Sequence, residues 1–205
     1  MKILIRGGSI AAGYGVKKGY ADILKSHYHS GKHEIINCSR PKETSFDGLD
    51  SFFEDIDSLK PDLLMLHFGI DDAFFPVYRS EFKENLVHII RMATGRFNPD
   101  IALITSHLFD NPYEMEAVNI YYRVIREVSI DLKCAMIPIH TYWAGYLFQN
   151  RLNRTDLLQQ DSRYPNEWGH SVYAEAIIHW LSSRYGTGGL TINGSSFVND
   201  ATLIQ

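Results

Sequence analysis

Cysteine is scarce in this sequence. Cys38 and Cys134 are the only two among 205 residues, and they lie far apart along the chain. Two such cysteines do not form the disulfide framework that staples small secreted domains. Each stands beside a predicted strand, so both are expected to be buried free thiols, which pack as small apolar groups. This scarcity points to a cytoplasmic location.

Long apolar runs and basic clusters are also missing. No apolar run approaches the ~20 residues that a membrane-spanning helix needs, and no charged-then-apolar leader precedes the first predicted strand at Lys2. The net charge is −4, and lysine and arginine form no run. These features argue against nucleic-acid binding and against a polybasic membrane-binding surface. We therefore expect neither a nucleic acid nor a membrane as a partner.

What the chain does contain is a regular alternation of short apolar runs and helical patterns. With 45% hydrophobic and 13% aromatic residues, it is long enough to form one domain with a substantial core. The apolar runs are nearly continuous, as expected for strands covered on both faces. They lie at 2–6, 33–37, 62–68, 100–106 and 134–139, and the helical patterns lie at 17–28, 46–59, 80–94, 114–132 and 168–184.

This order predicts a parallel sheet with right-handed crossovers, and hence a three-layer α/β domain over residues 1–185. Residues 186–205 are rich in glycine, serine and asparagine and are predicted to form a separate tail, either mobile or packed on a neighbour. Ligands of open parallel sheets bind beyond the carboxyl ends of the strands. The loops that follow the strands, and the loop 160–166 before the last helix, are therefore expected to face one crevice.

The first of these loops, in "KILIRGGSIAAGYG" (2–15), fits two interpretations. A dinucleotide site needs G-x-G-x-x-G directly after the strand, and Gly7, Gly8 and Gly13 miss that spacing. The second strand ends in "NCSR", where NAD sites usually place an acidic residue, although Arg40 there suits a 2′-phosphate. Nucleotide binding is the weaker interpretation. The other interpretation is that the turn presents Ser9 as a nucleophile.

Four sequence blocks resemble, in order, those of the SGNH/GDSL hydrolases. The first is "ILIRGGSIAAGYG", the second "IINCSRPKETSFDGL" (35–49), the third "PDLLMLHFGIDDAF" (61–74) and the last "DSRYPNEWGHSVYAEAI" (161–177). Each block alone is a weak signal, but four in order on a matching α/β alternation form a strong one. The resemblance implies a flavodoxin-like sheet of five parallel strands and a serine that attacks a small acyl ester. We expect no cofactor.

The resemblance implies a catalytic set that is only partly present. Ser9 matches the nucleophile, and Asp161 matches the aspartate that orients the catalytic histidine. Tyr164 stands where that histidine, the proton acceptor, is expected. Tyrosine, with an ordinary pKa of about 10, is mostly protonated at neutral pH and makes a poor proton acceptor. Gly8 replaces the aspartate that usually precedes the serine.

The implied oxyanion-binding groups are altered as well. Lys42 stands where the second block usually has a glycine, although its own backbone N–H can serve if the turn tolerates a side chain. In the third block, which begins at Gly69, Asp71 stands where an asparagine amide is expected. A carboxylate donates no hydrogen bond and repels a developing oxyanion. The loss of one such donor typically costs about 10²–10³ in rate.

Several histidines are candidates for the missing base. His107 and His140 follow the fourth and fifth strands, and His67 lies near the end of the third. A shifted register that pairs Glu167 with His170 restores an acid-x-x-His pair, but the neighbouring "PN" and "GH" favour the unshifted register. His170 is then expected to cap or pack the last helix. Taken singly, each histidine is more often structural than catalytic.

Asp71 itself has several interpretations. It is a candidate base, a binding group for an amine-bearing substrate, or part of a divalent cation site with Asp72 or Asp161. No spacing signature supports the cation site, so no metal is predicted. The plainest interpretation is a hydrogen-bonded loop residue in a site that has lost its chemistry.

Aromatic residues cluster in two places. Tyr121 and Tyr122 lie in a predicted helix, so at least one should be in the core. Tyr142, Trp143 and Tyr146 follow the fifth strand, where they either pack inside or wall one side of the crevice.

These features support two main hypotheses and one variant. The first is a GDSL-like serine hydrolase that acts on a small-molecule acyl ester through an altered catalytic set. The second is a non-catalytic binding protein on the same fold, because the base and the oxyanion amide are replaced together. The variant is an acyltransferase, which uses the same covalent chemistry but excludes water. The sequence assigns no oligomeric state.

Overall fold

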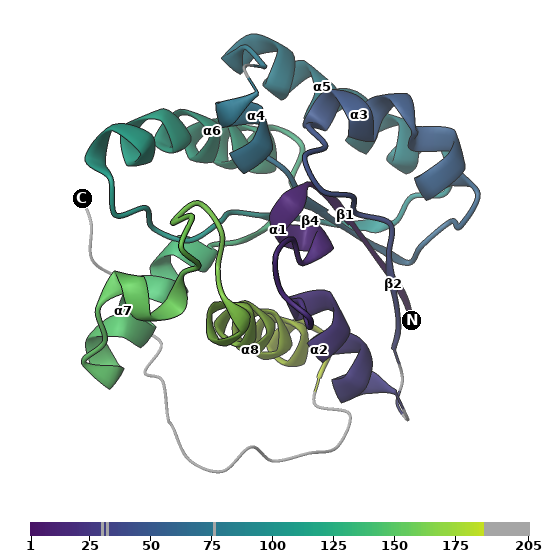
Figure 1. The fold of residues 1–205 in the computed structure, drawn as a ribbon. Helices are drawn as coiled ribbons and strands as arrows, with labels where there is room; N and C mark the ends of the chain where they lie inside the picture. Colours follow the sequence, from purple (N-terminus) through teal and green to yellow (C-terminus); the bar gives the residue numbers. More distant parts are fainter. Residues whose placement is uncertain (30, 32, 76, 187–205) are drawn as a thin grey trace.

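A computed structural model of the chain describes residues 1–29, 31, 33–75 and 77–186, so most of the expected tail 186–205 lies outside the described residues. Five parallel strands form one sheet in the order β2-β1-β3-β4-β5 (Figure 1). The expected three-layer, flavodoxin-like α/β architecture is confirmed. The strands are β1 (Lys2–Gly7), β2 (Glu34–Asn37), β3 (Leu63–His67), β4 (Asp100–Ile104) and β5 (Ala135–Ile137).

Helices cover both faces of the sheet. Figure 1 shows α3, α4, α5 and α6 on one face and α2, α7 and α8 on the other, with the short α1 between the two layers. The helices are α1 (Ser9–Ala12), α2 (Tyr20–Tyr28), α3 (Ser45–Asp50), α4 (Ile70–Phe74), α5 (Arg79–Arg96), α6 (Pro112–Asp131), α7 (Ile139–Asn150) and α8 (Glu167–Tyr185). A π-helical turn (Phe53–Asp57) and a 3₁₀ turn (Arg154–Leu157) complete the described elements.

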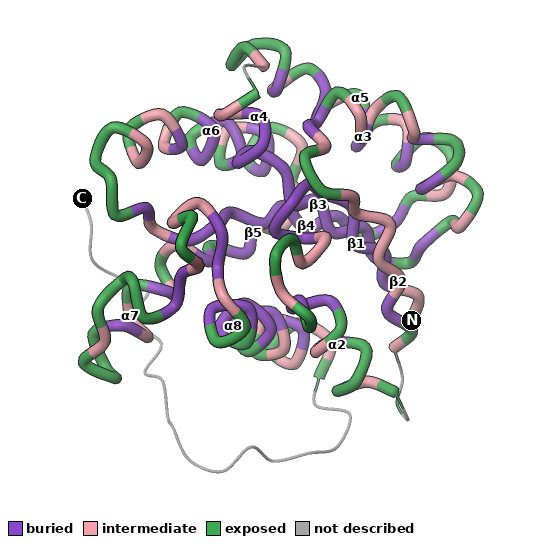
Figure 2. Tube along the Cα trace, in the orientation of Figure 1, coloured by how far each residue is buried: buried purple, intermediate pink, exposed green. Residues whose placement is uncertain are grey.

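The core lies along the central strands, which Figure 2 shows as buried. Every residue of β3 is buried, and so is β1 after Lys2. This burial explains why the two strands read as continuous apolar runs, since helices cover both of their faces. In α5, the residues with helical spacing that were expected to face the core do so: Phe82, Leu86, Ile89 and Ile90.

Some expected elements differ in the structure. The helix expected at 46–59 is broken into α3 and the π-helical turn, which carries Asp55 inward to pair with Arg6. The strand expected at 134–139 ends at Ile137, because α7 begins at Ile139 directly after Pro138. The sequence did not predict α7. Its buried positions are Ile139, Trp143 and Leu147, and the aromatic residues next to them obscure their helical spacing.

Two expectations about side chains are also corrected or resolved. Cys38 and Cys134 are free, but they are half-buried rather than buried. Trp143 is fully buried, so it does not wall an open crevice, and both Tyr121 and Tyr122 belong to the core. In the described part of the chain, no helix combines the length and the apolar character that crossing a bilayer requires.

Candidate active site

The carboxyl ends of the two central strands bring the first and third sequence blocks together. β1 and β3 pair with Gly7 opposite His67. The chain then turns into α1 at Ser9 and into α4 at Ile70. Because these turns lie side by side, Ser9 meets Asp71 although 62 residues separate them.

Asp71 holds Ser9 through two hydrogen bonds. Ser9 Oγ donates to Asp71 Oδ1 (2.7 Å), and Ser9 N–H donates to Oδ2 (2.6 Å). Ser9 exposes 0% of its surface and Asp71 only 4%. Burial raises the pKa of Asp71, although the hydrogen bonds from Ser9 oppose that shift. A carboxylate with a raised pKa is a stronger proton acceptor than an ordinary one, and this carboxylate already accepts a hydrogen bond from the hydroxyl of Ser9.

Lys42 reaches the same hydroxyl from the second block. Its backbone N–H donates to Ser9 Oγ (2.8 Å). The φ angle of Lys42 is 66°, in the left-handed region where glycine is most easily accommodated. The turn therefore keeps the conformation of a glycine position while carrying a lysine. The N–H groups of Ser9 and Lys42 are both engaged by groups of the chain itself.

Tyr164 covers another side of Ser9. Its side chain lies near that of Ser9, and its ring centroid lies 5.0 Å from that of Tyr14. Burial and then the nearby charge of Asp71 raise the pKa of Tyr164. The phenol therefore stays protonated at neutral pH and is a hydrogen-bonding partner rather than a base.

Asp161 is exposed and pairs with Arg163. The guanidinium of Arg163 donates from Nε to Asp161 Oδ1 (2.9 Å) and from Nη2 to Oδ2 (2.6 Å), and these bonds lower the pKa of Asp161. Arg163 also lies over the rings of Phe74 (5.2 Å) and Tyr164 (5.8 Å). Its charge lowers the pKa of Asp71, against the effect of burial. Arg163 was not predicted from the sequence, although a cation between Asp161 and Tyr164 was a visible signal.

Gly69 and Asp72 build the turn rather than face Ser9. Asp72 is fully buried and accepts from the N–H groups of Ser45 (2.8 Å) and Gly69 (2.9 Å). Gly69 has a φ of 122°, which a side chain rarely adopts. Because the Gly69 N–H already donates to Asp72, it is bonded within the third block. Burial raises the pKa of Asp72 to about 6.

Three of the candidate histidines lie in the core. His67, His107 and His170 are buried, and burial lowers their pKa to about 3, 3 and 4. In the part of the chain that the structure describes, the Ser9 side chain has no hydrogen bond to a histidine. The partners of the three rings are Tyr20 OH and Ser106 Oγ for His67, Tyr173 OH for His107, and the N–H of Tyr20 for His170.

His140 is placed away from Ser9. Its Nδ1 lies 2.8 Å from Thr105 Oγ1, and its ring stacks on Tyr122. It follows β5, the edge strand, whereas Ser9 follows β1. Three strand spacings of about 4.8 Å separate those two strands, on the order of 14 Å in all.

A buried ionic cluster, also missed in the sequence, supports the loop that carries Lys42. Arg6 is fully buried on β1 and pairs with Glu43 (2.6 Å) and Asp55 (3.0 Å). Arg40 pairs with the same two carboxylates. Charges this deep need partners, so the cluster ties residues 40–43 to the strand. The sequence did contain a signal for this cluster, since Arg6 is a charged residue inside the apolar run "KILIRG".

Metal-binding geometry is absent from the described residues. No group of three or more histidine, cysteine, aspartate or glutamate side chains among them is arranged to hold a metal ion. Asp71 and Asp72, which the sequence offered as neighbours in such a site, are instead turned toward backbone N–H groups.

Known proteins resemble this chain in sequence pattern and in fold. Residues 6–172 match the GDSL-like Lipase/Acylhydrolase family. A lipase/acylhydrolase from Enterococcus faecalis has 22% identity and a TM-score of 0.75, covering 89% of this chain and 96% of that one. A catalytic mutant of Axe2, an acetylxylan esterase from Geobacillus stearothermophilus, has 18% identity and a TM-score of 0.77, covering 92% and 97%.

A third solved structure, TesA, has 20% identity and a TM-score of 0.76, covering 89% of this chain and 99% of that one. No curated protein sequence matches the chain. At these identities the structural likeness establishes the fold alone. It does not show which residues are catalytic.

Proposed function

The chain belongs to the GDSL-like lipase/acylhydrolase family, and we propose that it hydrolyses a small acyl ester through Ser9, with Asp71 as the proton acceptor. The observation that carries this proposal is the 2.7 Å hydrogen bond from Ser9 Oγ to Asp71 Oδ1. The raised pKa of the buried carboxylate supports the same role, since a base works best when its pKa lies near the operating pH.

Proton transfer to Asp71 removes the objection to a carboxylate beside an oxyanion. Ser9 Oγ bonds to the acyl carbon while its proton passes to Asp71, and the carbonyl electron pair moves onto the carbonyl oxygen. The negative charge thus moves from the carboxylate to the oxyanion, and the net charge of the buried site does not change. A neutral carboxyl no longer repels the oxyanion.

The same transfer releases the backbone donors. The Asp71 carboxylate accepts the N–H of Ser9, and Ser9 Oγ accepts the N–H of Lys42. A neutral carboxyl is a weaker acceptor than a carboxylate, and Oγ loses acceptor strength once it is acylated. Both N–H groups then bind the oxyanion more strongly than they bind their resting partners.

The cycle closes without another base. When the tetrahedral intermediate collapses, the bond to the leaving alcohol breaks, and the alcohol oxygen takes the proton from Asp71. Water then attacks the acyl carbon of acyl-Ser9 and passes a proton to Asp71. When this second tetrahedral intermediate collapses, the bond from the acyl carbon to Ser9 Oγ breaks, Oγ takes the proton back from Asp71, and the carboxylic acid leaves. Tyr164, which stays protonated, lies beside Ser9 and takes no part in the proton transfer.

The size of the acyl group follows from the burial of the site. Ser9 and Asp71 are almost without exposed surface, so a small group such as acetyl fits this position better than a long chain. The similar structure from Geobacillus stearothermophilus is described as an acetylxylan esterase, which is in line with an acetyl ester as substrate.

One observation favours a second candidate, the non-catalytic binding protein. Ser9 exposes no surface, and the two N–H donors beside it are already satisfied by the chain. Such an arrangement is also what a serine retained for structure adopts. The two candidates differ in whether Ser9 reacts.

The deciding experiment measures turnover of short-chain aryl esters and labelling by a fluorophosphonate probe. We expect both in the wild type and neither in Ser9→Ala. Asp71→Asn should lower kcat by about 100-fold or more, because the amide accepts no proton. Asp50→Asn, an exposed carboxylate on α3, serves as the matched control and should leave kcat unchanged.

The pH profile provides a second readout. Burial raises the pKa of Asp71, so activity should rise with pH through a midpoint above the ordinary carboxyl value of about 3.9. Folded wild-type protein without labelling or turnover would establish the binding protein instead. Turnover that survives in Asp71→Asn would rule out Asp71 as the base, and products formed by transfer to added alcohols or amines would indicate an acyltransferase.

A further inference from the structure

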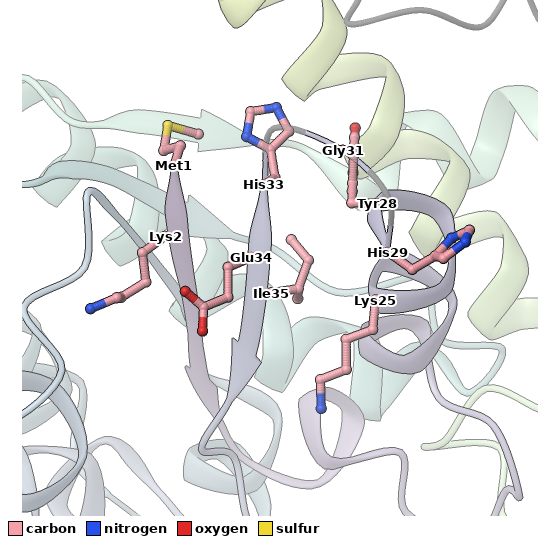
Figure 3. Close-up of a pocket in the computed structure, with 9 residues that line it drawn as sticks. All are labelled: Met1, Lys2, Lys25, Tyr28, His29, Gly31, His33, Glu34 and Ile35. Carbon is pink, nitrogen blue, oxygen red and sulfur yellow. The ribbon is translucent and has the colours of Figure 1, made fainter.

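One pocket, at the amino-terminal edge of the sheet, has among its described residues no polar side chains that point toward a common ligand position. It is lined by the Met1–Lys2 and His33–Ile35 segments and by the end of α2. Figure 3 shows that the amines of Lys2 and Lys25 do not point toward one another. Lys2 Nζ already donates to Leu59 O (2.9 Å). These side chains do not form a common site.

A different cavity lies at the edge strand β5. It has a volume of about 310 Å³ and opens between α6 and the start of α7; Figure 2 shows β5 between these two helices. Sites for small molecules begin at about this size. The lining residues are Asn119, Tyr122, Arg123, Arg126, Met136 and His140.

Two arginines give this cavity its charge. Arg123 and Arg126 are three residues apart on α6, so their side chains emerge as neighbours on one helix face. Within the described ranges, neither forms an ion pair. The acidic residues that follow them on α6, Glu127 and Asp131, pair with Arg79 and Lys83 of α5 instead. The cavity is therefore positive on a chain whose net charge is −4.

The floor of the cavity is rigid and partly flat. The rings of Tyr122 and His140 stack with centroids 5.2 Å apart and an interplanar angle of 26°. Tyr122 OH donates to His107 O (2.8 Å), and His140 Nδ1 is bonded to Thr105 Oγ1 (2.8 Å). Ring orientations fixed in this way are preorganised for a ligand, and Met136 adds an apolar wall.

We propose that this cavity binds a small organic phosphate, with the phosphate on Arg123 and Arg126 and a compact apolar group against Met136 and the Tyr122–His140 pair. The guanidinium fork matches phosphate oxygens in a bidentate manner. An uncompensated pair of arginines over an apolar floor suits a ligand with one doubly charged end and one apolar end. The site is distinct from the one at Ser9, since about three strand spacings separate β5 from β1.

Isothermal titration calorimetry with phenyl phosphate tests this proposal on the full chain at low ionic strength. We expect saturable binding with inorganic phosphate as a weaker competitor. Arg123→Gln and Arg126→Gln should each weaken binding about 10-fold, and the double variant should abolish it, because each removes a charge-assisted hydrogen bond. Phenol, which lacks the charge, should not bind measurably.

Two control variants test whether phosphate binds in this cavity rather than elsewhere on the molecule. Arg91→Gln removes an exposed arginine of α5 and should leave the affinity unchanged. Ser9→Ala should also leave it unchanged, which excludes phosphate binding at the active site. Three results would each overturn the proposal: no saturation by about 10 mM phenyl phosphate, which is weaker than millimolar binding; an equal loss of affinity in Arg91→Gln; or full affinity in the double variant.

Discussion

At the residue scale, Gly8 and Asp71 depend on one another. A Cβ at position 8 would lie 2.1 Å from Asp71 Oδ2 and 2.4 Å from Glu43 O. The carboxylate therefore occupies space that a side chain at position 8 would need. This contact links two positions where the sequence blocks imply a departure from the family pattern, a glycine where an aspartate is expected before the serine and an aspartate where an asparagine is expected.

Gly8→Ala tests that dependence. We expect the methyl group to displace the Asp71 carboxylate from Ser9, lowering the free energy of unfolding by about 1–3 kcal/mol and lowering any Ser9-dependent activity. Gly145→Ala is the matched control, because a Cβ there meets nothing within 4 Å and lies in the helix α7. It should be stabilising by about 0.5–1 kcal/mol. Urea unfolding measures both, and an unchanged midpoint for Gly8→Ala would show that Asp71 is not confined there.

At the element scale, the segment before α8 determines which groups reach Ser9. Gln159 N–H donates to Tyr164 O (2.9 Å), and Tyr164 N–H donates to Asp161 O (3.0 Å). The Asn166 side chain caps α8 by accepting from Gly169 N–H (2.9 Å). These bonds hold Tyr164 over Ser9. They leave the Asp161 carboxylate at the surface, where Arg163 binds it.

This arrangement predicts what is needed to restore a histidine-based site. Tyr164→His with Asp71→Asn should raise esterase activity above that of Asp71→Asn alone, because it adds a base to the amide donor that both variants carry. Adding Arg163→Gln should raise it further, since Asp161 is then free to orient the new imidazole. Steady-state kinetics with aryl acetates measures the series. A folded triple variant no more active than Asp71→Asn would contradict the assignment of positions 161 and 164.

At the scale of the whole molecule, a polar layer lies between the sheet and the helices α2 and α8. The rings of Tyr20 and Tyr173 stack at 5.7 Å, and His67, His107 and His170 lie around them. All five side chains are buried. Burial keeps the histidines neutral, because a charged imidazole is costly in such surroundings. The layer therefore ties the stability of the fold to pH.

We expect the protein to lose stability on mild acidification. The three histidines have pKa values of about 3, 3 and 4 in the folded state, below the ordinary value of about 6.5. Between pH 6.5 and 4 the unfolded chain therefore binds more protons, and their contribution to stability is lost as pH falls. Asp72, with a pKa of about 6, and Asp71, whose pKa burial also raises, act in the opposite direction but are outnumbered by the three histidines.

Urea unfolding at pH 7 and pH 5.5 measures this effect. We expect the free energy of unfolding to fall by on the order of 2 kcal/mol. His88→Gln, which removes an exposed histidine of α5, should show the same pH dependence as the wild type. An unfolding midpoint that is equal or higher at pH 5.5 would mean that the buried histidines are already protonated in the folded state.

The sequence by itself determined the architecture and the place of the site. Nearly continuous apolar runs such as 62–68 indicated strands buried on both faces, and their alternation with helices indicated a parallel sheet. The four ordered blocks placed Ser9, Lys42, Asp71 and Tyr164 in loops at one edge of that sheet. Both inferences rest on local patterns, which a sequence displays directly.

Only the tertiary structure decided which groups touch the hydroxyl of Ser9. The pairing of Gly7 with His67 sets Ser9 against Asp71, and Asp161 lies at the surface, where it is bonded to Arg163. His67, His107 and His170, equal candidates in the sequence, are packed into the core. The choice of proton acceptor depends on distances of a few ångströms between residues far apart in the chain, and those distances are set by strand register and side-chain packing.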